Sequence, residues 1–132
     1  MKEPIVASSH RPILVVEDDQ FLRELLIEKL LSSGLPAHGA VDGKEAFAQL
    51  KTVRPALIIL DIILPDINGF EILAKIRSDE KLKAIPVLIL SNLDQKQDFD
   101  RAQSLGVEGF MIKSNFSLGE IVTKVRSIVG TN

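Results

Sequence analysis

The sequence of 132 residues predicts a three-layer α/β sandwich, in which helices cover both faces of a parallel sheet. Two patterns predict this class. Uninterrupted apolar runs at 13–16, 57–60 and 86–90 suit strands that are buried on both faces. Segments with apolar residues at helical spacing alternate with these runs, which implies right-handed crossovers between parallel strands. The length fits one domain, and 45% hydrophobic with 26% charged residues is an ordinary globular balance.

The strands are recognised by their apolar, often β-branched, residues and by the turn residues around them. In chain order we expect five strands, at 13–16, 37–41, 57–60, 86–90 and 109–112. The second has the weakest pattern. The residues before the first strand, 1–12, show no periodicity and are expected to form a flexible leader. The domain is then expected to span 13–129, followed by a short tail at 130–132.

Each strand is followed by a segment whose apolar residues form one helical stripe. The first helix ends at Gly34 and Pro36, the second ends before Pro55, and the fourth, at about 94–105, ends at Gly106. The residues expected to face inward are Phe21, Leu22, Leu25, Leu26 and Leu30 in the first helix, Ala46, Phe47 and Leu50 in the second, Phe70, Leu73 and Ile76 in the third, Phe99, Ala102 and Leu105 in the fourth, and Leu118, Ile121, Val122, Val125 and Ile128 in the fifth.

The composition excludes or disfavours several classes of protein. The chain has no cysteine, which excludes a disulfide scaffold, a zinc–cysteine site and thiol catalysis. Its net charge is −2 and it has no block of basic residues, so we expect no direct binding to nucleic acid. It shows neither a signal-peptide run nor an apolar segment long enough to span a bilayer. We therefore expect a cytoplasmic protein with no membrane partner.

Polar side chains directly follow the strong strands. The apolar runs end in Glu17 and Asp18, in Asp61, in Ser91 and in Lys113. Because the carboxyl ends of parallel strands share one edge of the sheet, these groups should converge there. Three carboxylates repel one another and Lys113 supplies only one positive charge, so a divalent cation is expected, and Mg²⁺ fits a site with few protein ligands. A carboxylate nucleophile, a metal, a hydroxyl and an ammonium are the parts that phosphoryl transfer needs.

In this ordered set the chain resembles the receiver domain of two-component response regulators, over residues 13–129. The resemblance is carried by Glu17, Asp18 and Asp19 after the first strand, Asp61 after the third, Pro65 and Gly69 in the next loop, Ser91 and Lys113. The intervals agree as well, with 43 positions from Asp18 to Asp61, 30 from Asp61 to Ser91 and 22 from Ser91 to Lys113. The resemblance implies a flavodoxin-like sandwich with the strand order 2-1-3-4-5.

The resemblance also implies roles for individual residues. Asp61 would accept a phosphoryl group from a phosphohistidine of a sensor histidine kinase or phosphotransfer protein. Asp18, Asp61 and the backbone carbonyl of Ile63 would bind Mg²⁺, and Glu17 would act mainly through a metal-bound water. Lys113 would pair with Asp61 and then with the phosphoryl oxygens.

The implied response to phosphorylation is a small repacking. Ser91 would turn inward to hydrogen-bond the phosphoryl group, and Phe110 would change rotamer with it. These movements would reshape the face of the fourth helix, fifth strand and fifth helix, where a downstream protein would bind. Such a protein is not an enzyme, although it assists its own phosphorylation and dephosphorylation.

Two positions depart from the commonest pattern of this family. Ser114 follows Lys113, where a proline in a cis peptide is usual. A cis bond before serine costs about 2.5–4 kcal/mol, so this peptide is either trans or a strained cis. Asn92 stands where a small residue is common, and its amide would narrow access to Asp61 or contact the phosphoryl group. Phe110 lacks a hydroxyl and can switch only by packing.

Three other functions stay open. The two departures leave open a receiver-like docking module that acts without phosphorylation, although the presence of all five residues of the site argues against it. A flavodoxin-like cofactor binder would need a phosphate-binding loop after the first strand, where acidic residues would repel a flavin phosphate. A magnesium-dependent phosphatase with an aspartate nucleophile usually has a second aspartate two residues later, and here that residue is Ile63.

Overall fold

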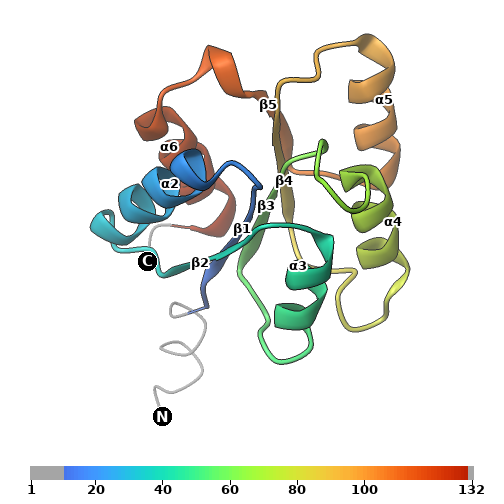
Figure 1. Cartoon of the computed structure of the whole chain (residues 1–132), viewed down its shortest axis with the longest axis horizontal. Helices are drawn as coiled ribbons and strands as arrows, with labels where there is room; N and C mark the ends of the chain where they lie inside the picture. Colours follow the sequence, from blue (N-terminus) through green and yellow to red (C-terminus); the bar gives the residue numbers. More distant parts are fainter. Residues whose placement is uncertain (1–10, 131–132) are drawn as a thin grey trace.

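The computed structural model describes residues 11–130, which form a parallel five-stranded sheet with helices on both faces (Figure 1). The strand order is β2-β1-β3-β4-β5, so the predicted fold class and strand order are confirmed. All four pairs of neighbouring strands are parallel. Of the expected leader, residues 1–10 lie outside the described part of the chain, as do residues 131 and 132 of the expected tail.

The strands are β1 (Ile13–Val16), β2 (Ala37–Ala40), β3 (Leu57–Leu60), β4 (Val87–Ser91) and β5 (Gly109–Ile112). The helices are α2 (Gln20–Ser32), α3 (Gly43–Leu50), α4 (Gly69–Ser78), α5 (Lys96–Leu105) and α6 (Leu118–Val129). A single 3₁₀ turn, η1 (Lys113–Asn115), precedes α6 and was not predicted. Each predicted strand and helix is present, and β2, β4 and α5 differ from their predicted bounds by one or two residues.

The sheet has an apolar layer on each side because its side chains alternate between two clusters. Leu14 and Val16 point into the layer beneath α3, α4 and α5, whereas Ile13 and Val15 point into the layer beneath α2 and α6. Figure 1 shows these two groups of helices on opposite sides of the strands. The central strands β1 and β3 are buried along their whole length, which explains their uninterrupted apolar runs.

One of the side chains that were predicted to face the core does not do so. Phe21 is 75% exposed, although it fits the apolar stripe of α2. It lies in the first turn of the helix, next to the carboxyl end of β1, where the sheet no longer covers the stripe. The exposed large hydrophobic side chains of the described residues are Phe21, Leu31, Val41, Ile63 and Phe116.

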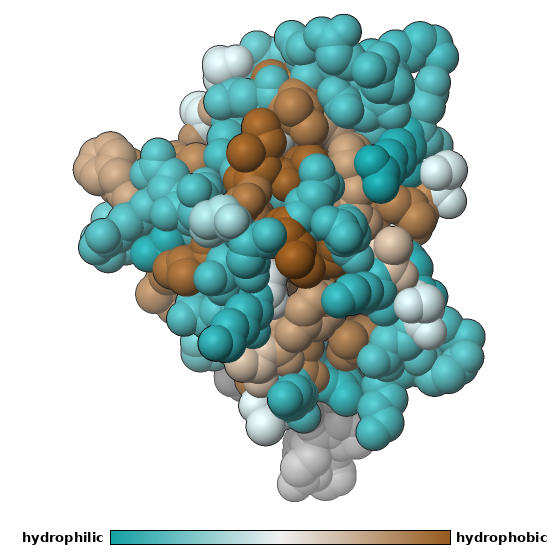
Figure 2. All heavy atoms as spheres, turned by 45° about the vertical axis from the view of Figure 1, so that its right-hand side comes forward, coloured by the Kyte–Doolittle hydropathy of each residue, from teal (hydrophilic) through white to brown (hydrophobic). Residues whose placement is uncertain are grey.

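The face shown in Figure 2 is hydrophilic over much of its periphery, and hydrophobic atoms reach the surface mainly through its centre. None of the helices within residues 11–130 is long and apolar enough to cross a membrane.

The loop between β3 and α4 is held against the end of β3 by Gly69. The N–H of Gly69 donates to the carbonyl of Ile62 at 2.7 Å. A Cβ at position 69 would clash with the backbone carbonyl oxygen of Asp61 and would lie 2.6 Å from the Cα of Ile62. Only glycine permits this approach, because the obstructing atoms are backbone atoms that cannot turn away.

Asp66 ties the same loop to the N-terminus of α3. Its two carboxylate oxygens accept the N–H groups of Gly43 and Lys44 at 3.0 and 2.9 Å. The N-cap residue, Asp42, accepts the next N–H, that of Glu45. The hydrogen bond from Gly43 is the main cause that lowers the pKa of Asp66 below its usual range. A carboxylate at a helix N-terminus is stabilising because it faces unpaired N–H groups and the positive end of the dipole.

We predict that Gly69→Ala lowers the free energy of unfolding by about 2–3 kcal/mol, because the added methyl group pushes on backbone atoms. Urea unfolding measures this change. Gly119→Ala is the matched control, since Gly119 lies in the first turn of α6 and its Cβ would meet only Ser117 Oγ, at 3.8 Å. There, alanine should be neutral or stabilising by up to about 1 kcal/mol. Equal effects at the two glycines would contradict the argument from close approach.

We predict that Asp66→Asn lowers the free energy of unfolding at pH 7 by about 0.5–1 kcal/mol. The pKa of Asp66 is lowered in the folded chain, so its stabilisation is present above the ordinary pKa of aspartate and is lost as the pH falls through the folded value. The gap between parent and variant should therefore close in acid, as measured by urea unfolding at several pH values. Asp94→Asn is the control, because its carboxylate accepts from the side chain of Gln95 instead of a helix N-terminus. A gap that stays constant down to pH 3 would refute the proposed electrostatic origin.

Candidate functional site

Three carboxylates meet at the carboxyl edge of the sheet. Glu17 and Asp18 follow β1, and Asp61 follows the neighbouring strand β3. One carboxylate oxygen of each lies within 4.8 Å of the other two. Glu17 and Asp61 are buried, at 3% and 4% exposure, whereas Asp18 is exposed. The strand order thus brings together acidic residues that are 43 positions apart in the sequence.

Lys113 bridges the two buried carboxylates. Its Nζ lies 2.7 Å from Glu17 Oε1 and 2.7 Å from Asp61 Oδ2. Burial alone would lower the pKa of Lys113, but the hydrogen bonds to Asp61 and Glu17 outweigh it, so the pKa is raised. Burial raises the pKa of Glu17 despite the opposing hydrogen bond from Lys113. Lys113 is therefore a firmly charged ammonium between two carboxylates that it does not fully neutralise.

The charge balance and the donor set fit a hard divalent cation. Three ionised carboxylates and one ammonium leave two formal negative charges uncompensated. Mg²⁺ prefers carboxylate oxygens together with water, and the exposed side of the cluster, at Asp18, is open to solvent. Asp18, Asp61 and Glu17 could hold such an ion. The loop that carries Ile63 lies against the cluster, since the N–H of Ile63 donates to Asp61 Oδ1 at 3.3 Å.

Ser91 ends β4 beside the cluster and is fully buried. Its Oγ has no hydrogen-bond partner within the described part of the chain. Leaving a buried hydroxyl unpaired costs free energy of the order of 1–3 kcal/mol. An acceptor within reach of this hydroxyl would remove that cost.

The peptide between Lys113 and Ser114 is trans, since residues 11–130 contain no cis peptide. This observation decides between the two alternatives that the sequence left open. The N–H of Ser114 donates to Asn92 Oδ1 at 3.2 Å. Asn92 therefore contacts the loop after β5, and Lys113 reaches the acidic cluster without a cis bond.

Phe110 lies in β5 and is half-buried. Its ring packs against the ring of Phe99 of α5, with centroids 4.6 Å apart and an interplanar angle of 73°. Such an edge-to-face pair contributes about 0.5–1.5 kcal/mol beyond its buried area. Phe110 thus links β5 to α5.

Sequence reasoning missed Arg23, which supports the site from α2. Its Nη1 donates to the backbone carbonyl of Glu17 at 2.8 Å. The carboxylate of Glu17 in turn accepts the N–H of Asp19 at 3.1 Å. Both contacts hold the chain where β1 turns into the acidic loop. No sequence signal separates Arg23 from an ordinary solvated helix arginine, so only the structure identifies it.

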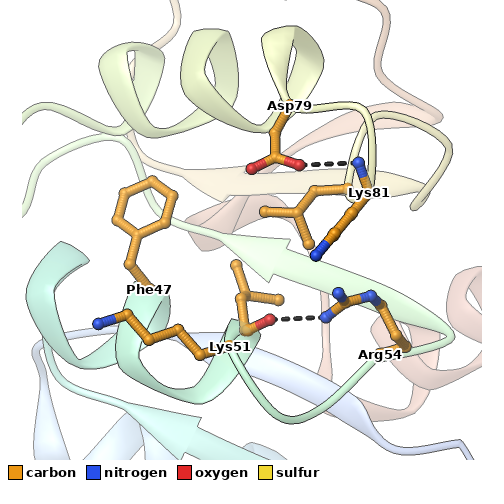
Figure 3. A pocket seen from close by; sticks show the side chains of 7 residues that line it. Phe47, Lys51, Arg54, Asp79 and Lys81 are labelled. Carbon is orange, nitrogen blue, oxygen red and sulfur yellow. Dashed lines mark hydrogen bonds between the residues drawn. The ribbon is translucent and has the colours of Figure 1, made fainter.

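An open groove of about 270 Å³ lies at the opposite edge of the sheet, near the amino end of β3 (Figure 3). Lys51, Arg54, Asp79 and Lys81 are among its lining residues. Arg54 donates to the carbonyl of Leu50 at 2.6 Å, and Asp79 accepts the backbone N–H of Lys81 at 2.7 Å. Arg54 thus satisfies a carbonyl at the C-terminal end of α3, and Asp79 stabilises the turn that follows α4. The groove therefore gathers no reactive set comparable to the one around Asp61.

Comparison with known proteins finds a family model described as the response regulator receiver domain, which matches residues 13–126. The chain is 33% identical over 117 residues to the DNA-binding dual master transcriptional regulator RpaA of Synechocystis sp., covering 89% of this chain and 48% of the relative. It is 33% identical over 120 residues to the alkaline phosphatase synthesis transcriptional regulatory protein PhoP of Bacillus subtilis, covering 91% and 49%. The chain thus spans about half the length of these curated relatives.

Solved structures agree on the fold. The chemotaxis protein CheY4 of Vibrio cholerae superposes with a TM-score of 0.82 at 24% identity, covering 89% of this chain and 98% of that one. The phosphorylated cyanobacterial phytochrome response regulator RcpA superposes with a TM-score of 0.77 at 36% identity, covering 90% and 91%. The family model spans nearly all the described residues. This chain therefore belongs to the response regulator receiver domain family of two-component signalling.

Proposed function

We propose that this chain is a phosphorylation-dependent switch that accepts a phosphoryl group on Asp61, with the help of Mg²⁺. The donor would be a phosphohistidine on a sensor histidine kinase or a phosphotransfer protein. One observation carries the proposal: a buried aspartate at the end of β3 is paired with a half-buried lysine inside a carboxylate cluster that has excess negative charge. In a purely structural ion pair the charges normally compensate each other, whereas the excess negative charge of this cluster would attract a cation and an electrophilic phosphoryl group.

The chemical step uses Asp61 as the nucleophile. A carboxylate oxygen of Asp61 forms a bond to phosphorus while the phosphorus–nitrogen bond of the phosphohistidine breaks. The leaving nitrogen keeps the electron pair and takes up a proton, and the product on this chain is an acyl phosphate. In the structure, Lys113 pairs with Asp61, and after the transfer its ammonium would pair with the phosphoryl oxygens instead. Positioning and charge stabilisation are the main contributions that a protein makes to such transfers.

The metal would be held by Asp18, Asp61 and the backbone carbonyl of Ile63, with Glu17 acting through water. When bound, Mg²⁺ supplies positive charge against the developing charge on the phosphoryl oxygens. The excess negative charge of the cluster and its oxygen donors support this assignment. In the absence of a cation, the three carboxylates repel one another.

The conformational response would start at Ser91. Its buried, unpaired Oγ becomes a donor to a phosphoryl oxygen once Asp61 is modified. Phe110 would repack with it, and because Phe110 contacts Phe99 of α5, the change reaches the α5–β5–α6 face. We propose this face as the surface that binds a downstream protein.

The phosphodonor would approach from the carboxyl edge. Three of the exposed large hydrophobic side chains, Phe21, Ile63 and Phe116, follow β1, β3 and β5 at that edge. Apolar side chains around a charged site suit a protein partner. RpaA and PhoP are named as transcriptional regulators, but the similarity covers about half of each, and we propose no direct nucleic-acid contact for this chain.

The docking module that acts without phosphorylation receives less support. It rested on the departures at Asn92 and Ser114. With the trans peptide and the hydrogen bond between these residues, Lys113 still contacts Asp61 at 2.7 Å. The departures therefore leave the charge arrangement of the site in place.

We predict that the parent chain gains one phosphoryl group when incubated with acetyl phosphate and Mg²⁺, and that Asp61→Asn gains none. Intact mass spectrometry detects the adduct, and chelation of Mg²⁺ should abolish its formation. Asp79→Asn, at the opposite edge of the sheet, is the matched control and should be modified like the parent. If the folded parent forms no adduct with any small donor or divalent metal, the docking module becomes the better account.

We predict that Ser91→Ala stabilises the unphosphorylated chain by about 0.5–2 kcal/mol, because it removes a buried hydroxyl that has no partner. Urea unfolding without Mg²⁺ tests this, and Ser104→Ala, whose hydroxyl donates to the carbonyl of Arg101, is the control. Ser91→Ala should still be phosphorylated, but phosphorylation should no longer shift the NMR signals of the Phe110 ring. A variant that is destabilised by more than about 1 kcal/mol would show that Ser91 Oγ already has a partner.

A further inference from the structure

A single hydrogen bond joins the two loops that flank the site. The N–H of Ser114 donates to Asn92 Oδ1 at 3.2 Å, across 22 positions of sequence. Asn92 directly follows Ser91, whose Oγ is buried and unpaired. Ser114 directly follows Lys113, whose Nζ pairs with both buried carboxylates. The bond therefore lies one residue away from each of two groups that the proposed switch uses.

The bond requires both residues as they stand. A proline at position 114 would have no N–H to donate. A small residue such as alanine at position 92 would have no oxygen to accept. The trans peptide between Lys113 and Ser114 belongs to the geometry in which this N–H meets Asn92. The two positions at which this sequence departs from the common pattern are therefore the two partners of one contact.

The bond also satisfies a local need. Ser114 is the second residue of η1, and the first N–H groups of a helical turn have no partner within the turn. The residue before the turn, Ile112, provides no side-chain cap. Asn92 supplies the missing acceptor from the loop after β4. Since η1 begins at Lys113, orienting the turn orients the backbone from which the lysine side chain extends.

We infer that Asn92 is a positioning residue, which with Ser114 forms a clamp that holds Lys113 against Asp61 and Glu17 and couples Lys113 to Ser91. A proline after Lys113 would make the backbone rigid at this point; here the Asn92–Ser114 clamp restrains it instead, through a bond to the adjacent loop. A lysine side chain is long and flexible, so its two 2.7 Å contacts depend on where its backbone is fixed. When the end of β4 moves, the clamp moves the η1 turn with it.

The consequence for phosphorylation rests on the proposed function. Lys113 stabilises the phosphoryl oxygens only if its ammonium is in place when they arrive, so loosening η1 should slow phosphorylation of Asp61. The expected slowing is about three- to tenfold, the range for the net loss of one hydrogen bond. The existence of the clamp itself does not depend on phosphorylation.

The test compares the parent with Asn92→Ala, Ser114→Pro and the double variant. Ser114→Ala is the reference for Ser114→Pro, because it removes the hydroxyl and keeps the N–H donor. Asn115→Ala is the matched control for Asn92→Ala, since it removes an exposed amide from the η1 turn itself and leaves the Asn92–Ser114 bond in place. The first readout, amide hydrogen exchange of Ser114 without Mg²⁺ or phosphodonor, should accelerate about three- to tenfold in Asn92→Ala relative to Asn115→Ala.

The second readout is the rate of phosphorylation by acetyl phosphate with Mg²⁺, followed by intact mass. Asn92→Ala should be about three- to tenfold slower than Asn115→Ala, and adding Asn92→Ala to Ser114→Pro should slow phosphorylation no further, because the bond is already lost in Ser114→Pro. Unchanged exchange of the Ser114 amide in Asn92→Ala, or multiplied slowing in the double variant, overturns the clamp. A parent that forms no adduct overturns the proposed function instead, and the exchange readout then decides on the clamp alone.

Discussion

The bridge from Lys113 to Glu17 and Asp61 is the interaction on which the rest of this site depends. Two carboxylates that are almost fully buried lose most of their hydration, and one ammonium between them restores part of that loss. The arrangement is stable only while the ammonium keeps its contacts with both carboxylates. Every nearby structural feature can be understood as a means of keeping the ends of β1, β3 and β5 at the right separation.

The supports come from different parts of the fold. Backbone hydrogen bonding between parallel strands sets β1 beside β3, and Arg23 fixes the carbonyl at which the chain leaves β1. Gly69 lets α4 start against the carbonyl of Asp61, while Asp66 ties the intervening loop to α3. These supports are backbone contacts or hydrogen bonds to backbone groups, so they fix the loops at the level of the main chain.

The sequence was sufficient to predict the fold because its central strands have no polar face, a pattern that few architectures other than a covered parallel sheet can accommodate. It also indicated which groups would converge, since strand ends share an edge. It was misleading for Phe21, because periodicity records which side of a helix a residue occupies and not where the sheet stops covering it. The contact between Asn92 and Ser114 could not be predicted, since a hydrogen bond between two loops depends on backbone positions that no local pattern encodes. The unpaired state of Ser91 is a similar case, because burial and pairing depend on the surrounding side chains.

The unphosphorylated site leaves two needs unmet at the same place: excess negative charge in the carboxylate cluster and a buried hydroxyl without an acceptor. Under the proposed function, a divalent cation would compensate the excess charge, and the oxygens of a phosphoryl group would pair with the hydroxyl and give Lys113 a new partner. A ligand shifts a conformational equilibrium only by its difference in interaction energy between the two states. Pairing one buried hydroxyl contributes about 1–3 kcal/mol, which is the usual size of a coupling energy between sites. Under the proposed function, the unmet hydrogen bond of Ser91 would be large enough to drive a population shift at the α5–β5–α6 face, and small enough for that shift to reverse when the phosphoryl group is lost.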